Sequence, residues 1–238
     1  MPITRSNSPS VLRAKSFLRG EAIAFGDANR LWKQLKREDE LSLARAVLER
    51  IRKKSHALLD RVPPENRQQL CQQHAELTSK DPELNSALRH DQALEILDEG
   101  FDLKSAALDG DGETLGVAGG IYKRRWTDLG QLKDLQQAAK LYERALLLEP
   151  TRTIANNNLA VILSVNDNIE EAMKHAVAAL RSSPNDPELL DTLGSIQIKA
   201  GAYKAAAATY QRAADIDPLN PRWRQWLDTL PHGAQPDK

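Results

Sequence analysis

Small and apolar residues between positions 119 and 220 recur at one fixed spacing of 34 residues. The recurring columns are Ala138, Ala172 and Ala206; Tyr142, Ala176 and Tyr210; Ala145, Ala179 and Ala213; and Pro150, Pro184 and Pro218. Within each repeat the alanines of the first and third columns, such as Ala138 and Ala145, are seven residues apart. Seven residues make about two helical turns, so the two alanines lie on one face of a helix. The proline ends that helix because it has no N–H and clashes with the preceding turn. This period predicts a stack of helical pairs.

The first helix of each pair carries its own small residue. Leu159-Ala160 and Leu193-Gly194 are again 34 residues apart. We expect the leucine to fill the core of the pair and the small residue to let two helices approach closely. The predicted helices of this region are 113–127, 134–149, 153–165, 169–181, 187–200 and 203–215. A last helix, 221–230, contains Trp223, Trp226, Leu227 and Leu230 and is expected to cover the exposed end of the array.

The N-terminal half has a helical pattern without a strict period. We predict helices at 9–19, 21–37, 40–60, 66–80 and 84–99, with Ser8-Pro9 starting the first and Gly20 ending it. The pair 21–37 and 40–60 has its apolar residues in repeat-like phase, so we interpret it as a degenerate pair of the same kind. The predicted organisation is a disordered leader at 1–8, a divergent helical region at 9–111, the array with its capping helix at 112–230, and a flexible tail at 231–238.

These columns resemble a known repeat family. The residues Leu193-Gly194, Gly201, Ala206, Tyr210, Ala213 and Pro218 are similar to the tetratricopeptide repeat signature at nearly every position. Repeat 153–186 matches with Ala160, Ala172, Ala179 and Pro184, but has Leu163 where the family prefers tyrosine. In the leading repeat Gly119 and Tyr122 match, while the loop predicted at 128–133 is about seven residues longer than the family norm. The resemblance implies an all-α, α-α superhelix; it says little about function, because these arrays share a binding geometry and not a chemistry.

A second resemblance covers about residues 20–225. The segments Lys80-Asp81-Pro82, Arg89 to Glu95, Glu113 to Gly116 and Gly120 to Trp126 look like a bacterial repeat family. That family is related to the region N-terminal to the kinase domain in apoptosis signal-regulating kinases, which is described as TRAF-binding. The resemblance implies a regulatory interaction module. It implies no partner, because these 238 residues include no kinase domain and no TRAF-binding peptide.

Composition narrows the class of protein. Hydrophobic residues make up 41% and charged residues 28%, which is ordinary for a soluble globular chain. No apolar run approaches the roughly 18 residues that span a bilayer, and the single Cys71 excludes an internal disulfide, so we expect a cytoplasmic protein. Residues 1–60 carry 13 basic and 7 acidic residues, a balance of +6, which is too small for a nucleic-acid binder. The basic first twenty residues fit either a targeting presequence or, as we prefer, a solvated tail before a helix.

No pattern in the sequence predicts catalysis, a cofactor or a metal. Cys71 and His74 could share a helical face, but two ligands do not make a structural zinc site, and we interpret them as a half-buried helical seam. Gly116, Gly119 and Gly120 follow no strand and lie inside a predicted helix. They therefore do not form a phosphate-binding loop, and we attribute them to close helix packing.

The candidate binding residues come from the repeat resemblance, which implies that the first helices line a concave groove. The positions on that face are Lys123 and Arg124 in the leading repeat, Asn157, Asn158 and Val161 in the next, and Asp191, Thr192 and Ser195 in the last. Ile154, Val165, Glu188 and Lys199 share the face. Asn158 holds the position where the family often places an asparagine that binds a peptide backbone. Chaperone-binding members would have basic residues at 188 and 192, so Glu188 and Thr192 disfavour a chaperone tail as ligand.

The cluster Tyr122 to Trp126 allows two interpretations. In one, Lys123 and Arg124 face the groove and make it basic at one end, opposite the acidic Glu188 and Asp191. A ligand of complementary charge order then fits. In the other, Tyr122 and Trp126 belong to the core and the basic residues are merely solvated.

The sequence therefore predicts a non-enzymatic adaptor or regulatory scaffold whose groove binds a peptide or helix of another protein. An enzyme or ligand sensor is the alternative, with a pocket near Arg89, His90, Asp91 and Lys123 between the N-terminal half and the array. Convergence of perturbed titratable groups would favour it. A structural subunit of a larger assembly is the third interpretation. We expect neither nucleic acid nor membrane as a partner.

Overall fold

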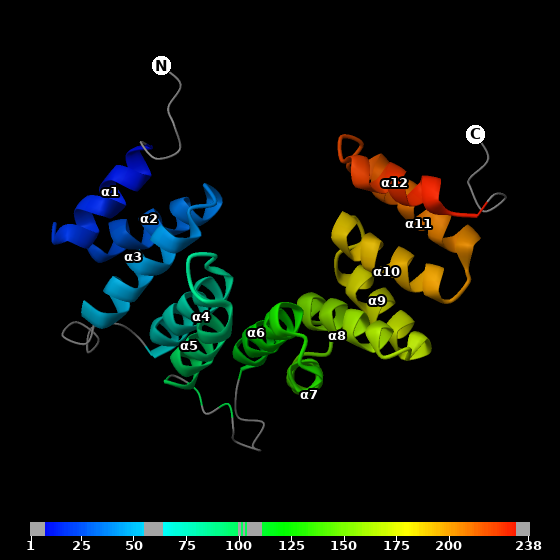
Figure 1. Ribbon diagram of the computed structural model, residues 1–238, viewed down its shortest axis with the longest axis horizontal. Coiled ribbons are helices and arrows are strands. Elements are labelled where there is room, and N and C mark those ends of the chain that lie inside the picture. Colours follow the sequence, from blue (N-terminus) through cyan, green and yellow to red (C-terminus); the bar gives the residue numbers. More distant parts are fainter. Residues whose placement is uncertain (1–7, 55–63, 100, 102, 104–110, 232–238) are drawn as a thin grey trace. The chain divides into compact units, whose positions relative to one another are not determined.

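The computed structural model describes residues 8–54, 64–99, 101, 103 and 111–231 (Figure 1). In these ranges the chain consists of helices and connecting turns, without a strand. The helices are α1 (Pro9–Arg19), α2 (Phe25–Arg37), α3 (Leu41–Lys54), α4 (Pro64–Lys80), α5 (Ser86–Asp98), α6 (Gly112–Leu129), α7 (Leu132–Leu148), α8 (Thr153–Val165), α9 (Ile169–Ser182), α10 (Pro187–Lys199), α11 (Tyr203–Ile216) and α12 (Pro221–Thr229). The predicted all-α fold is confirmed.

The chain forms two compact units. Unit 1 contains Met1–Gly110 and Val117–Ala138, and unit 2 contains Asp111–Gly116 and Ala139–Lys238. Helices α6 and α7 therefore contribute to both units. The division predicted between residues 9–111 and 112–230 follows the sequence repeat, and it stays a prediction.

Unit 1 is built from α1 to α5 with parts of α6 and α7. Ser8 begins α1 by accepting a hydrogen bond from the Val11 N–H at 3.3 Å, and Gly20 ends it with a φ of 128°. Helix α2 packs on α3, α3 on α4, and α4 on α5, so the predicted pairing of 21–37 with 40–60 is confirmed. The core is formed by α1, α2, α3 and α4 and includes Phe17, Trp32, Leu35, Leu48 and Leu77.

Several predicted helix limits in unit 1 need correction. Helix α2 begins at Phe25 and not at residue 21, because Ala24 is extended and the buried stripe starts only at Ala28. Helix α4 begins at Pro64, earlier than the predicted residue 66, in agreement with the preference of proline for a first turn. The end predicted for the helix at 40–60 lies partly outside the described residues, which include α3 as far as Lys54.

The repeat columns are the seams of the array. The side chains of the first three columns are 0–1% exposed: Ala138, Tyr142, Ala145, Ala172, Ala176, Ala179, Ala206, Tyr210 and Ala213. Helices α7, α9 and α11 each end two residues before the proline of their repeat. A side chain added at Gly194 would place its Cβ 2.6 Å from the Tyr210 ring, so this glycine is required for close packing. Gly116 differs, because an added Cβ would meet nothing within 4 Å, and close packing does not explain it.

The leading repeat differs from its predicted form. Only Gly130 and Gln131 separate α6 from α7, so the long loop predicted at 128–133 is wrong. The extra residues lengthen the helices: α6 has 18 residues and α7 has 17, whereas α8 and α9 have 13 and 14. A φ of +70° at Gly130 allows the tight turn, since glycine adopts this conformation at little cost.

Helix α12 covers the last pair of unit 2. Trp223 is 1% exposed, and the ring of Trp226 stacks on Tyr210 with centroids 5.6 Å apart and planes inclined by 11°. Asn220 starts the helix by accepting a hydrogen bond from the Arg222 N–H at 3.1 Å. The predicted closing helix is thus present, and it packs on α11.

Candidate functional site

The predicted binding residues fall into two sets, one in each unit. Six of them lie on α8 and α10 of unit 2, which pack against each other. We call this surface the α8–α10 face; its residues are Ile154, Asn157, Asn158, Val161 and Val165 of α8 and Glu188, Asp191, Thr192 and Ser195 of α10. The other two, Lys123 and Arg124, lie on α6 in unit 1.

Helix α8 is apolar on two opposite sides. Leu159 and Ala160 point into the pair and are 2% and 0% exposed. On the other side Ile154 is 64% exposed and Val165 is 42% exposed, although both are large apolar residues. The spacing from 154 through 158 and 161 to 165 follows one helical face. The core of the pair therefore does not account for the apolar residues of this face.

Asparagine side chains lie between these apolar residues. Asn158 Nδ2 donates to the Ile154 carbonyl oxygen at 3.0 Å, one turn earlier in the same helix. Asn157 Oδ1 is covered from solvent, and no described residue donates a hydrogen bond to it. A buried acceptor without a donor is unfavourable by about 1–3 kcal/mol. Neighbouring Asn156 instead belongs to the interior, where Nδ2 donates to the Pro150 carbonyl oxygen at 2.9 Å.

The residues of α10 are more strongly engaged within the unit. Thr192 is 8% exposed, and its hydroxyl donates to the Glu188 carbonyl oxygen at 3.2 Å. Ser195 donates to the Thr192 carbonyl oxygen at 2.9 Å. Lys199 Nζ donates to the Ser164 carbonyl oxygen at 2.8 Å and so links α10 to α8. The hydroxyl hydrogens of Thr192 and Ser195 are therefore used by the helix itself.

The acidic end of the face contains a cation that the sequence reasoning missed. Arg222 of α12 pairs with Asp191 and lies 3.5 Å from the Glu188 carboxylate. Burial raises the pKa of Asp191, although the nearby Arg222 acts in the opposite direction. The expected acidic end is thus partly neutralised. Only the packing of α12 brings Arg222 to α10, so the repeat period contained no signal for this pair.

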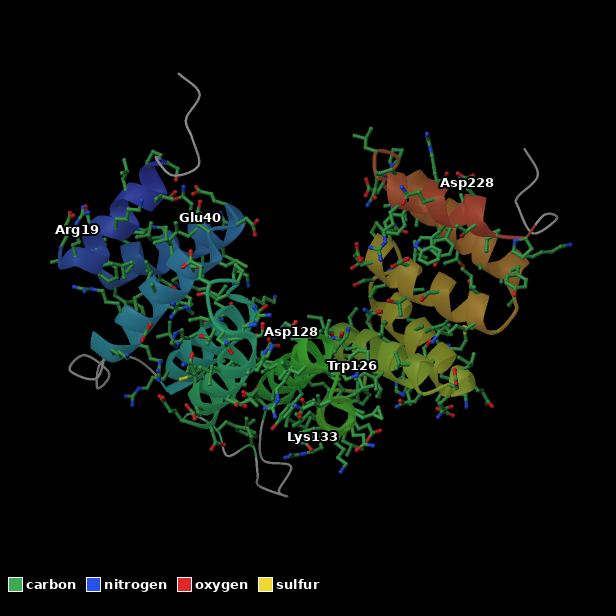
Figure 2. All side chains as sticks on the ribbon, in the orientation of Figure 1. Arg19, Glu40, Trp126, Asp128, Lys133 and Asp228 are labelled. Carbon is green, nitrogen blue, oxygen red and sulfur yellow. The ribbon has the colours of Figure 1, made fainter. Side chains whose placement is uncertain are left out.

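The basic residues in unit 1 belong to a charged cluster formed by the end of α4, helices α5 and α6, and the first turn of α7. Its members are Ser79, Asp81, Arg89, His90, Asp91, Lys123, Arg124, Arg125, Asp128 and Asp134. Asp128, labelled in Figure 2, accepts a hydrogen bond from Arg89 and lies 2.8 Å from His90 Nε2. Burial lowers the pKa of His90 despite this carboxylate. Burial would raise the pKa of Asp128, but His90 and Arg89 lower it.

The three consecutive basic residues of α6 are half-buried. Arg124 Nε donates to Ser79 Oγ at 3.0 Å, and Arg125 binds Asp91 at 2.6 Å and Asp134 at 3.1 Å. Burial and the adjacent Arg124 lower the pKa of Lys123. The interpretation of these residues as merely solvated is therefore wrong.

The aromatic residues next to these basic residues, Tyr122 and Trp126, are half-buried and do not belong to the core. The Arg125 guanidinium lies 5.8 Å from the centre of the Tyr122 ring and covers it. The buried stripe of α6 is Leu115, Ala118 and Ile121, each 0% exposed, and it includes neither Tyr122 nor Trp126.

In the predicted half-buried seam on α4, Cys71 is half-buried as expected, but His74 is fully buried. Leu70, His74 and Leu77 are 7%, 2% and 0% exposed, and Cys71 is half-buried. Burial raises the pKa of the Cys71 thiol, which opposes a role as nucleophile. Burial, together with the nearby Arg52, lowers the pKa of His74 to about 3. No three carboxylate, imidazole or thiol groups of the described residues are placed to hold a metal ion.

Comparison with known proteins gives the family. The model of the Tetratricopeptide Repeats-Sensor family matches residues 25–163, more than half of the chain. The chain belongs to this family. A tetratricopeptide repeat model also matches residues 131–196 and 166–227, so the predicted repeat resemblance is confirmed. The resemblance to the kinase-related family stays a prediction.

Solved structures of tetratricopeptide repeat proteins share the fold of this sensor-family chain. A thermophilic repeat protein from Thermus thermophilus is 16% identical with a TM-score of 0.62, and the match covers 86% of this chain and 98% of that one. YrrB, described as having an unusual peptide-binding site, is 14% identical with a TM-score of 0.51, covering 92% and 97%. The C-terminal part of a repeat protein from Cytophaga hutchinsonii is 16% identical with a TM-score of 0.55, covering 85% and 68%. At these identities the likeness concerns the fold alone.

The family assignment makes the chain a repeat protein, of a fold class that suggests a scaffold for protein–protein interaction. Among the helices described for this sensor-family chain, none is long and apolar enough to cross a membrane.

Proposed function

We propose that the protein is a non-enzymatic adaptor that binds an extended segment of a partner protein on the α8–α10 face. The observation that carries this proposal is the apolar surface of α8. Ile154 and Val165 are 64% and 42% exposed, and Asn157, Asn158 and Val161 lie between them. An exposed apolar surface with interspersed polar groups is typical of a binding site.

The chemistry of the face fits a peptide. A carboxamide offers both a donor and an acceptor, as a peptide backbone requires. Apolar side chains of a bound segment can pack on Ile154, Val161 and Val165. At the α10 end, Arg222 already neutralises part of the charge of Asp191, so the ligand needs less positive charge there than the sequence alone suggests.

A comparative capture experiment tests this function. Immobilised wild-type protein and the variant Ile154→Asp are incubated with extract of the source cells, and the bound proteins are quantified by mass spectrometry. We expect at least one partner to be retained by the wild type and reduced about tenfold by the variant, because a charge replaces an apolar contact. Leu147→Asp is the matched control, since Leu147 is also an exposed apolar residue, 69%, but belongs to α7.

Two results contradict this function. One is a set of bound proteins that is the same for the wild type and for Ile154→Asp. The other is an equal loss with Leu147→Asp, because it would reflect general stickiness of exposed apolar residues and not a site on α8.

A ligand sensor is a second candidate function, favoured by the charged cluster of unit 1. Perturbed groups converge there as the alternative interpretation requires: the pKa values of His90 and Lys123 are lowered, with burial as the main cause. Arg89 and His90 meet at Asp128, while Asp91 pairs with Arg125. A cluster rich in guanidinium groups suits a small anionic ligand.

Thermal unfolding with inorganic phosphate, pyrophosphate and citrate as probes tests the sensor. We expect one of these anions to raise the melting temperature of the wild type, and Lys123→Gln to remove that increase. An increase of equal size in Lys123→Gln, or no increase with any of the probes, contradicts a sensor of anions at this cluster. The capture experiment is independent of this result, because it depends on unit 2.

A further inference from the structure

A pocket lies between α2 and α4 of unit 1 and shares no residue with the two surfaces described above. Its volume is about 270 Å³. The lining residues are Phe25, Asn29, Trp32 and Lys33 of α2 and Gln69, Leu70 and Gln73 of α4. We call it the α2–α4 pocket. An ion pair between Lys36 and Glu76, 3.3 Å long, joins the same two helices close to the pocket.

The floor of the pocket is apolar and fixed in place. Trp32 is 5% exposed and Leu70 is 7% exposed, so both belong to the core of unit 1. The indole N–H of Trp32 donates to Asn29 Oδ1 at 2.6 Å, which holds the ring in one orientation. Phe25, in contrast, is 43% exposed at the edge of the pocket. The pocket is smaller than the roughly 300–1,000 Å³ typical of small-molecule sites, so its size suits one side chain of a ligand.

Three carboxamides surround this apolar floor. Asn29 uses its oxygen for Trp32, and its amide nitrogen keeps two N–H donors. Gln69 is exposed and Gln73 is half-buried, and the side-chain carboxamide of neither makes a hydrogen bond with any residue that the structure describes. Carboxamides that flank an apolar pocket match a polypeptide backbone, which presents one N–H and one C=O per residue.

The charge of the pocket identifies the ligand further. Lys33 is the charged lining residue, and its ammonium lies 5.6 Å from the centre of the Trp32 ring. In the described ranges no carboxylate pairs with Lys33, whereas its neighbours Arg30 and Lys36 pair with Asp27 and Glu76. A cation held over an aromatic ring without a counter-ion favours a ligand with a negative group.

We propose that the α2–α4 pocket is a second peptide-binding site, which takes an extended segment of a partner protein. One apolar side chain of that segment enters the pocket over Trp32 and against Phe25. A carboxylate next to it pairs with Lys33, and the backbone bonds to Asn29, Gln69 and Gln73. Because this site lies in unit 1, the adaptor would bind two segments, and the second extends the function proposed for the α8–α10 face.

Binding of defined peptides to the full-length protein tests the site. The probes are fluorescein-labelled peptides of glycine and serine with one central Leu, Phe or Trp, flanked either by Glu or by Lys. Fluorescence anisotropy measures their affinity. We expect saturable binding of Glu-flanked peptides and weaker binding of the Lys-flanked ones. Lys33→Glu should reverse this preference, which a merely structural role of Lys33 would not do.

Two further variants remove the other contacts. Phe25→Ala should weaken binding about tenfold, because a large apolar contact is lost. Gln73→Ala should weaken it about three- to tenfold, as expected for the loss of one hydrogen bond. Lys15→Glu is the matched control for charge, since Lys15 is exposed on α1 of the same unit, and it should leave the preference unchanged. Circular dichroism of each variant verifies that it is folded.

The possible outcomes separate this site from the α8–α10 face. Asn158→Ala should not alter binding of these peptides; an equal loss with Asn158→Ala assigns them to unit 2 and contradicts the proposal. The proposal also fails if no Glu-flanked peptide binds saturably, or if Lys33→Glu keeps the original preference. A pocket for small anions rather than peptides is indicated if pyrophosphate protects the wild type but not Lys33→Glu from unfolding and the peptides do not bind.

Discussion

The contacts between helices differ in chemistry between the two units. In unit 2 small side chains allow neighbouring helices to approach: Ala172 and Ala206 are 0% exposed, and the Tyr210 ring fills the space at Gly194. In unit 1 the seams contain paired charges, such as Asp81 with Arg45 and Asp128 with Arg89. A period in the sequence reveals the first kind of seam because small residues must recur. It does not reveal ion pairs, because their partners come from helices far apart in the chain.

The comparison also separates the binding surfaces. The α8–α10 face has apolar residues and carboxamides on helices whose own core is complete. The charged cluster of unit 1 consists of residues that already bind one another. Each of them therefore contributes to the stability of the fold as well as to the binding of any ligand. Substitutions of the exposed α8 residues of the α8–α10 face should therefore change binding alone, whereas substitutions in the charged cluster should change both binding and stability.

The largest effect is expected where unit 2 loses its cover. Deletion of residues 219–238 removes Trp223 and Trp226 and exposes Tyr210. Loss of a buried tryptophan alone costs about 3–5 kcal/mol, and the uncovered face should cause association. Light scattering and thermal unfolding measure both effects. Deletion of 232–238 is the control and should have no effect; a monomeric 219–238 deletion with wild-type stability would show that α12 is not a cap.

Unit 1 should be most sensitive at Asp81. Its carboxylate is 0% exposed and accepts hydrogen bonds from Ser42 and Arg45 at 2.6 Å each and from the Glu83 N–H at 3.0 Å. Asp81→Ala leaves these donors without an acceptor, and we expect a loss of about 2–4 kcal/mol in the free energy of unfolding. Denaturant unfolding measures it. Asp228→Ala, at an exposed position of α12, should change stability little; equal losses would mean that the buried pair is not a principal stabilising contact.

A smaller effect is expected from overpacking a seam of unit 2. Ala206→Leu forces α11 away from its neighbours and should cost about 1–3 kcal/mol. Ala208→Leu introduces the same side chain at an exposed position of the same helix and should be almost neutral. Thermal unfolding of the two variants compares them directly. Equal melting temperatures would show that the alanine columns do not mark the helix contacts.

The pH dependence should be related to His74 of unit 1. Its pKa is about 3 in the folded protein against 6.5 for an ordinary histidine, so the unfolded chain binds a proton that the folded chain does not. Stability is then complete above pH 6.5 and declines as the pH falls from 6.5 towards 3. At pH 5 the loss should be about 2 kcal/mol. His74→Phe should reduce the decline between pH 7 and 5, measured by urea unfolding; an unchanged decline would assign it to other groups.

Much of the fold follows from the sequence, and the reasons lie in particular residues. The alanine columns determined the pairs from α8 to α11, and Asn220-Pro221 predicted α12. The loop at 128–133 was mispredicted because extra residues can lengthen helices as well as loops, and the sequence does not distinguish these. Arg222 escaped prediction because only tertiary packing brings it to Asp191. Whether Asn158 and its neighbours bind a ligand stays a prediction.

Calorimetric titration of the captured partner segment into wild type and Asn158→Ala tests the central claim most directly. The account predicts binding weakened about three- to thirtyfold, the equivalent of one or two hydrogen bonds. The melting temperature should remain that of the wild type, because the side chain lies outside the buried columns. Asn166→Ala, at the exposed end of α8, should bind like the wild type. Equal affinities for wild type and Asn158→Ala would contradict the assignment of the binding site to the α8–α10 face.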